Sequence, residues 1–335
     1  MAGHETYSLD DVELQSGVTL PHLELAFATY GELNAARDNV VVMPTFYAAQ
    51  HSDTEAMIGA GRALDPEKYF IVVPNMLGSG LSSSPSTTPP PFDRAAFPNV
   101  TIYDNVACQY RLVREHLGVD RVRLVVGYSM GAQQAFQWGA LHSDIVEAIA
   151  PFCGSARTSP HNRLFLDGIR AALLADETYA DGRYEGVPVK GMHAFGVVYA
   201  GWAFSQDFFR DEEYRKLGMN SVDDVVAFVE AYFGRRDPND LLAMLSTWWH
   251  ADISMNERFN GDLTAALRTI TARAIVMPCE SDLYFRVRDN ELEVAEMPNA
   301  ELRPIPSIWG HAAGLGANGA DNEFIDKALS ELLTP

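Results

Sequence analysis

Residues 124–136 read LVVGYSMGAQQAF, and they place Ser129 between Gly127 and Gly131 directly after an apolar run. Such a run is typical of a strand that is buried on both faces, and residues 132–142 have the composition of a helix. The two glycines allow a sharp turn and close packing of the helix on the strand. In this strand, turn and helix setting, the pattern G-x-S-x-G predicts a nucleophilic serine above the end of a sheet.

Other short apolar runs indicate further strands of the same sheet. They are rich in β-branched residues and occupy residues 39–43, 69–73, 122–126 and 273–277. Residues 104–117 have apolar side chains at helical spacing and end before Gly118, and residues 321–333 form a second such segment. Strands that alternate with helices predict the α/β class, with a mostly parallel sheet flanked by helices.

The pattern changes from residue 155 to residue 269. This part is rich in Ala, Leu and aromatic residues at helical spacing, most clearly over residues 162–174, 222–233 and 241–249. We therefore predict one core domain made of residues 1–154 and 270–335, with residues 155–269 inserted as a helical lid over the sheet.

Composition limits the possible partners and the cellular compartment. The chain has 335 residues, of which 47% are hydrophobic, and a formal net charge of -20. This charge would repel polyanions, so nucleic acid and anionic membranes are not expected as partners. The sequence does not start with a basic and apolar leader, and it has no apolar run of about 18 residues. Three widely spaced cysteines fit reduced thiols, so we expect a cytoplasmic protein.

A nucleophilic serine needs a base and an orienting acid. After a serine in this kind of turn, the chain order is acid and then histidine. Of the nine histidines, only His311 follows both the late strand and a candidate acid. In the loop after that strand, Asp282 is the preferred acid and Glu280 the alternative. No pair among the other histidines has metal-ligand spacing with a carboxylate, so we predict no metal and no cofactor.

The tetrahedral intermediate of acyl transfer also needs backbone donors for its oxyanion. The N–H group of the residue after the nucleophile supplies one donor, and the loop after an early strand supplies the other. These positions predict Met130 and, in the loop after residues 39–43, Tyr47, with Phe46 as the close alternative.

Together these residues resemble the homoserine O-acetyltransferase family of α/β-hydrolase-fold proteins, which also contains esterases that act on short-chain acyl esters. The resemblance covers nearly the whole chain and implies an α/β-hydrolase core with a helical lid and the triad Ser129, Asp282 and His311. The matching positions are residues 59–65, 69–70, 75–78, 97–104, 127–131 and 155–159, Arg170, residues 281–282 and residues 310–311.

The sequence departs from true homoserine acetyltransferases where that family holds its amino acid. The resemblance implies an Arg and a Tyr seven residues apart in a lid helix, and an Asp after the catalytic His. Here Gly196, Ala203 and Ala312 occupy those positions. Burying an unpaired charge costs several kcal/mol, so a zwitterionic acceptor would be poorly held.

The pocket is instead expected to suit a neutral or apolar acyl ester. Its predicted lining is aromatic: Phe46, Tyr128, Trp202 and Trp248. The leading hypothesis is a serine hydrolase that cleaves a short-chain or apolar acyl ester through an acyl-Ser129 intermediate. One alternative is a CoA-dependent O-acyltransferase with an acceptor other than homoserine, and another is an inactive homologue that only binds ligands. Apolar residues over 194–209 and 222–233 also suggest a homodimer formed through the lid.

Overall fold

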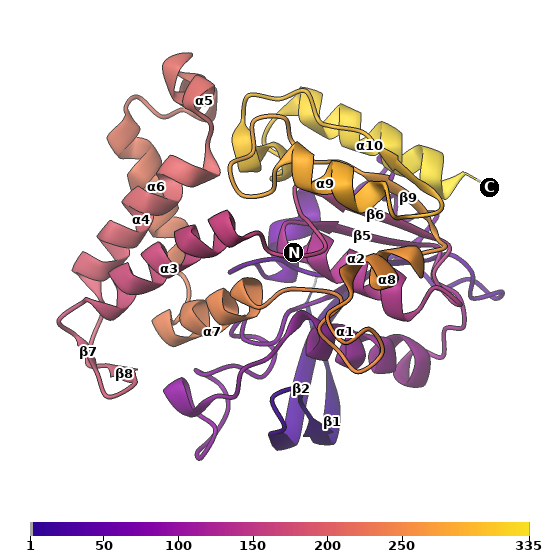
Figure 1. Ribbon diagram of the computed structural model, residues 1–335, viewed down its shortest axis with the longest axis horizontal. Coiled ribbons are helices and arrows are strands. Elements are labelled where there is room, and N and C mark those ends of the chain that lie inside the picture. Colours follow the sequence, from indigo (N-terminus) through magenta and orange to yellow (C-terminus); the bar gives the residue numbers. More distant parts are fainter. Residues whose placement is uncertain (1–2, 335) are drawn as a thin grey trace.

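The computed structural model describes residues 3–334, which build an eight-stranded sheet with helices packed against it (Figure 1). The strand order is β1-β2-β4-β3-β5-β6-β9-β10. Strands β4 to β10 of this order pair in parallel, whereas β2 pairs antiparallel with both β1 and β4. The predicted α/β class with a mostly parallel sheet is confirmed.

Four strands lie where apolar runs predicted them, and their apolar side chains form the centre of the core. They are β3 (Val40–Val42), β4 (Phe70–Pro74), β5 (Leu124–Tyr128) and β9 (Arg273–Val276). The last strand, β10 (Ala300–Leu302), pairs with β9 at one edge of the sheet.

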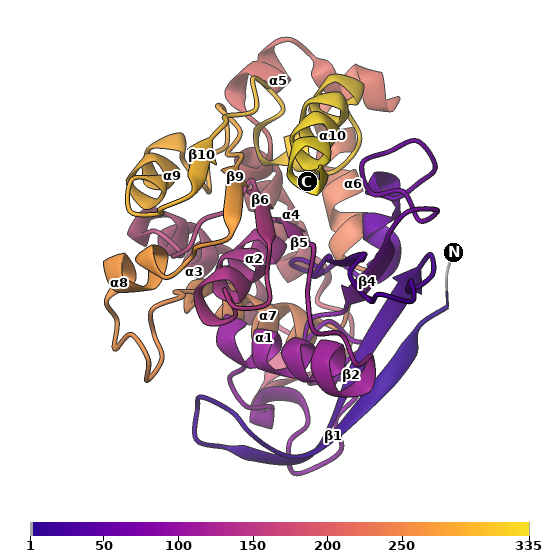
Figure 2. The ribbon, with the colours of Figure 1, turned by 90° about the vertical axis from the view of Figure 1, so that its right-hand side faces the viewer.

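Three other strands were not predicted, for two physical reasons. β1 (Glu5–Glu13) and β2 (Thr19–Tyr30) form a long hairpin at the opposite edge, seen at the lower right of Figure 2, and β1 exposes most of its side chains. β1 therefore lacks a continuous apolar run, and in β2 such a run is confined to residues 25–28. β6 (Ala148–Phe152) lies in the centre of the sheet but contains Pro151, a residue that normally argues against a central strand.

Helices cover both faces of the sheet. α2 (Met130–Leu141) packs on β5 and β6, and α10 (Gly319–Leu333) packs on β6 and β9 from the other side (Figure 2). α1 (Ile102–Arg111) lies against α2, and its first turn is capped by Thr101. Two shorter helices, α8 (Leu263–Arg268) and α9 (Val287–Val294), flank β9 in the chain.

Most of the chain between β6 and β9 is helical and lies to the left of the sheet in Figure 1. Serine or aspartate side chains cap several of these helices at their first turn, for example Ser159 and Asp237. Besides α8, this segment contains five α-helices and one small hairpin: α3 (Pro160–Leu174), β7 (Tyr179–Ala180), β8 (Arg183–Tyr184), α4 (Val189–Ala203), α5 (Gln206–Arg210), α6 (Val222–Phe233) and α7 (Pro238–Trp249). The division into core and lid domains stays a prediction.

Short turns of 3₁₀ or π geometry complete the fold: η1 (His51–Met57), η2 (Arg94–Ala96), η3 (Leu112–His116), η4 (Glu213–Leu217) and η5 (Gly310–Gly314). Within residues 3–334, none of the helices is both long and apolar enough to cross a membrane.

Candidate active site

Ser129 lies at a strained turn between β5 and α2. Its backbone has φ 57° and ψ -122°, a conformation that is unfavourable for a residue with a side chain. The two flanking positions leave no room for a side chain, so both must be glycine. A Cβ on Gly127 would lie 2.1 Å from the carbonyl oxygen of Gly131, and a Cβ on Gly131 would lie 2.7 Å from the carbonyl oxygen of Pro44. The close packing therefore holds the serine at the start of α2.

The structure brings together the three residues predicted as nucleophile, base and acid. His311 Nε2 lies 2.9 Å from Ser129 Oγ, and His311 Nδ1 lies 2.7 Å from Asp282 Oδ2. All three residues are at least nine-tenths buried. Glu280, the alternative acid, is exposed and has no hydrogen bond to His311 among the described residues. This geometry lets the histidine accept a proton from the serine while the carboxylate stabilises the resulting imidazolium.

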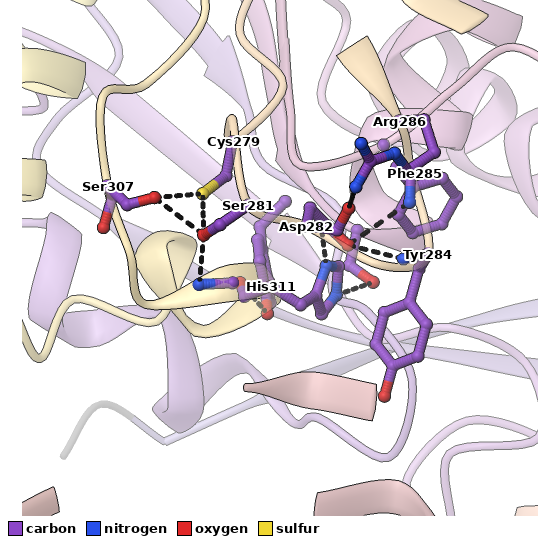
Figure 3. A network of polar contacts seen from close by, with 12 residues as sticks. Cys279, Ser281, Asp282, Tyr284, Phe285, Arg286, Ser307 and His311 are labelled. Carbon is purple, nitrogen blue, oxygen red and sulfur yellow. Dashed lines mark hydrogen bonds and ion pairs between the residues drawn. The ribbon is translucent and has the colours of Figure 1, made fainter. Parts of the chain in front are cut away.

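Backbone donors orient the carboxylate of Asp282. Its Oδ1 atom accepts hydrogen bonds from the N–H groups of Tyr284 at 2.7 Å and Phe285 at 3.2 Å (Figure 3). This leaves Oδ2 directed at the histidine. The carboxylate is thus held in one orientation, and that orientation sets the tautomer of His311 with its hydrogen on Nδ1.

The loop that carries His311 is tied to the loop that carries the acid. Ser281 Oγ accepts a hydrogen bond from the Gly310 N–H at 3.0 Å and donates one to the Ser307 carbonyl oxygen at 2.7 Å (Figure 3). From the other side, the Tyr128 hydroxyl donates to the carbonyl oxygen of His311 at 2.9 Å. Burial raises the pKa of Tyr128, so its hydroxyl stays protonated and keeps this donor.

Aromatic rings surround the imidazole. The ring centroids of Tyr128 and Tyr284 each lie 4.8 Å from that of His311, and that of Phe285 lies at 5.5 Å. These contacts restrict the rotation of the imidazole and keep bulk water from its faces.

Backbone donors are available near the serine. Within residues 3–334, the N–H groups of Met130, Phe46 and Tyr47 have no hydrogen-bond acceptor. The Met130 N–H also points out of the N-terminal end of α2, where the helix dipole favours negative charge. These groups suit an oxyanion. Which residue of the loop after β3 (the β3 loop, residues 43–50) donates stays a prediction.

A cavity of about 400 Å³ opens at Ser129 and His311, and its walls are mostly apolar. Phe46 and Tyr128, two of the four residues predicted for the substrate pocket, line this cavity. Trp202 and Trp248 do not line it, and the prediction for these two residues is corrected. Trp248 is fully buried and stacks on Phe285, whereas Trp202 faces a separate cavity of about 700 Å³.

Most of the lining was not predicted. It comes from α4, η4, α6 and the segment around η5, which are remote from the serine in the chain: Tyr199, Phe204, Leu217, Met219, Phe228, Val229, Tyr232, Phe233, Trp309, Leu315 and Ala317. One signal was present, because Phe228 and Tyr232, and likewise Val229 and Phe233, are spaced by one helical turn along α6. Their spacing predicted an apolar face but not the cavity that it borders.

Two of the three departures from the acetyltransferase pattern lie at the cavity. Ala203 and Ala312 line it, whereas Gly196 packs against α6, where a Cβ would lie 2.5 Å from Cγ of Glu230. Among the described residues that form the lining, Asp53 is the one carboxylate, and it is paired with Arg235 at 3.2 Å and with Arg236 at 3.3 Å. The cavity therefore offers no unpaired charge to a zwitterionic amino acid.

In the part of the chain that the structure describes, no group of three or more His, Cys, Asp or Glu side chains is arranged to hold a metal ion.

Comparison with known proteins shows the family to which the chain belongs. The α/β hydrolase fold family matches residues 38–217. An ethyl acetate hydrolase of Pseudomonas veronii is 37% identical over 98% of this chain and 95% of its own. The crystal structure of the acetyl esterase MekB superposes with a TM-score of 0.97 at 36% identity, over 99% of this chain and 97% of that one. A homoserine O-acetyltransferase of Methanobrevibacter ruminantium is 30% identical over 98% of this chain and 73% of its own.

The chain therefore belongs to the α/β-hydrolase fold family. Its likeness to esterases exceeds its likeness to homoserine O-acetyltransferases, as the sequence predicted. Within the family it is a carboxylic ester hydrolase.

Proposed function

We propose that the protein hydrolyses short-chain acyl esters of small alcohols through an acyl-Ser129 intermediate. Ser129 Oγ attacks the acyl carbonyl carbon while His311 Nε2 accepts its proton. The oxyanion is stabilised by the N–H of Met130 and one N–H of the β3 loop. His311 then donates the proton to the leaving alcohol, and a water molecule attacks the acyl-enzyme with His311 again as the base. Asp282 orients the imidazole throughout.

One observation carries this proposal: the hydrogen-bonded relay of Ser129, His311 and Asp282 opens into a small apolar cavity that offers no unpaired charge. A volume of about 400 Å³ lies near the lower end of the usual range for ligand sites, so a small substrate fits it best. A neutral ester leaves no buried charge unpaired, in contrast to an amino acid.

The names of the relatives support an acetyl group as the acyl part and a short alcohol as the leaving group. Both the ethyl acetate hydrolase and the acetyl esterase cover nearly this whole chain. We therefore propose acetate esters of short alcohols as the substrate class.

The test is a direct comparison of hydrolysis with acyl transfer. Purified wild type and Ser129→Ala are given ethyl acetate, and separately acetyl-CoA with and without homoserine, and the release of acetate and of free CoA is measured. We expect ester hydrolysis in the wild type, a loss of roughly 10⁴-fold or more in the variant, and no release of CoA. Release of CoA that depends on an added acceptor would replace hydrolysis by acyl transfer as the function.

We also propose that the protein is a homodimer that works in the cytoplasm. Four large apolar side chains on two lid helices are well exposed: Val189 at 70%, Val197 at 46%, Val222 at 49% and Phe228 at 47%. Burial of such a surface would stabilise a dimer. Three buried free cysteines suit a reducing compartment. Light scattering of the wild type and of Val197→Asp, together with fractionation of the producing cells, would test both proposals.

A further inference from the structure

A chain of buried polar side chains joins α1 and α2 to the loop after β3. The Trp138 indole N–H donates to Gln109 Oε1 at 2.9 Å, and Gln109 Nε2 donates to Gln134 Oε1 at 2.6 Å. Gln134 Nε2 then donates to two backbone carbonyl oxygens, that of Thr45 at 2.9 Å and that of Met130 at 3.1 Å. The three side chains are fully buried, and none of them lines the cavity at Ser129.

The chemistry of the groups sets the direction of this chain. The indole N–H of Trp138 can only donate, so the oxygen of the Gln109 amide must face it. The NH₂ group of Gln109 therefore faces Gln134, and the Gln134 side-chain oxygen accepts its hydrogen bond. The NH₂ group of Gln134 is then directed at the two carbonyl oxygens, which can only accept. Neither amide can be turned over without a clash of two donors or two acceptors, so the arrangement is unique.

The two carbonyl groups belong to the two elements that hold the oxyanion donors. The carbonyl of Thr45 shares a peptide unit with the N–H of Phe46, and in a trans peptide these two groups point in opposite directions. The Phe46 N–H therefore points away from Gln134. Met130 opens α2, and its N–H also points away from Gln134, out of the N-terminal end of the helix.

The other hydrogen bonds of Thr45 do not involve its carbonyl group. The N–H of Thr45 donates to Pro74, and its hydroxyl accepts from the N–H of Met76, but neither bond holds the carbonyl group. Gly131 brings the first turn of α2 close to the same loop. The Gln134 side chain thus connects two parts of the site by hydrogen bonds. It binds the Thr45 carbonyl, which belongs to the Phe46 peptide unit, and the Met130 carbonyl at the start of α2.

We propose that Gln134 is a positioning residue for the oxyanion hole, and that the N–H of Phe46, whose peptide unit Gln134 holds through the Thr45 carbonyl, supplies the second donor. Gln109 and Trp138 hold the carboxamide of Gln134 in its orientation. This inference rests on the proposed function, because an oxyanion forms only if Ser129 attacks a carbonyl group.

The test compares Gln134→Met with Gln137→Met. Methionine has nearly the volume of glutamine but donates no hydrogen bond. Gln137 lies on the same helix and is equally buried, but its amide donates to the carbonyl oxygen of Ile253, which is not part of the loop after β3. A fluorophosphonate titrates the reactive Ser129, so that kcat is expressed per active serine. A trifluoromethyl ketone, which forms a tetrahedral adduct with an oxyanion, reports the oxyanion hole separately.

For Gln134→Met we expect kcat per titrated serine to fall on the order of 100-fold, because small displacements of positioned groups have effects of this size. KM should change little, since the oxyanion exists only in the transition state and the intermediate. Affinity for the ketone should fall by a similar factor. Gln137→Met should keep wild-type values for all three quantities.

The proposal is overturned if Gln134→Met keeps the wild-type kcat and ketone affinity, or if Gln137→Met loses as much. Should Gln134→Met fail to fold, Gln109→Met decides the question, because it frees the Gln134 amide to turn and should also weaken ketone binding. If the wild type hydrolyses no ester, the proposed function is wrong. The proposed role of Gln134 would still be tested by the ketone affinities. A wild type that forms no adduct with the ketone would overturn both.

Discussion

Replacement of Asp282 by asparagine should reverse the tautomer of the histidine. In the wild type, Oδ1 accepts two backbone N–H groups and Oδ2 accepts the Nδ1–H of His311. An asparagine keeps its oxygen toward the two N–H groups, because turning it over would oppose its NH₂ group to both of them. Its NH₂ group then faces His311 Nδ1, which must become an acceptor.

The hydrogen of the imidazole then lies on Nε2, 2.9 Å from Ser129 Oγ, where it cannot accept the serine proton. Loss of the correctly held base is expected to lower kcat by about 10⁴-fold, which corresponds to about 5 kcal/mol in the activation free energy. The change is isosteric, so the fold and KM should be little affected.

The assay is hydrolysis of a short acetate ester by Asp282→Asn, with Glu280→Gln as the matched control. Glu280 lies two residues away and is exposed, so its variant should keep wild-type activity. Thermal unfolding of both variants checks that they are folded. A folded Asp282→Asn with more than about a tenth of the wild-type kcat would refute the reasoning, and so would an equal loss in Glu280→Gln.

Three further predictions follow from buried groups. Burial raises the pKa of Glu293 from 4.5 to about 8. Between these pH values the Glu293 carboxyl is ionised in the unfolded chain but protonated in the folded protein. The free energy of unfolding therefore falls by up to about 1.4 kcal/mol for each unit by which the pH rises. Glu293→Gln should flatten this slope in urea unfolding at pH 5, 6.5 and 8, and an unchanged slope would contradict it. Gly127→Ala should lower the free energy of unfolding by about 3 kcal/mol or more, because its Cβ would overlap the Gly131 carbonyl; unfolding like that of the wild type would show that the turn can relax. Ala203→Phe should fill part of the cavity and lower kcat/KM more for butyrate than for acetate esters, and an equal effect on both would place the acyl group elsewhere.

Much of the fold could be predicted from local sequence patterns. The parallel strands at the centre are buried on both faces, so each is a short continuous apolar run, and G-x-S-x-G marks the turn because only glycine fits beside Ser129. The edge hairpin β1–β2 was missed since it is half exposed, and β6 was missed since Pro151 interrupts its pattern. These strands depend on their neighbours in the sheet rather than on their own composition.

Sequence alone determined which residue types could perform the chemistry and in what order they occur along the chain: a serine in a strained turn, then an acid, then a histidine after a glycine. Tertiary structure decided which side chains share a space. Trp202 and Trp248 have the composition of a pocket wall but pack elsewhere, whereas Gln109 and Gln134, which belong to no motif, form a hydrogen bond to each other in the core. The physical reason is that periodicity records whether a side chain is buried, while its partner is set by the packing of elements far apart in the chain.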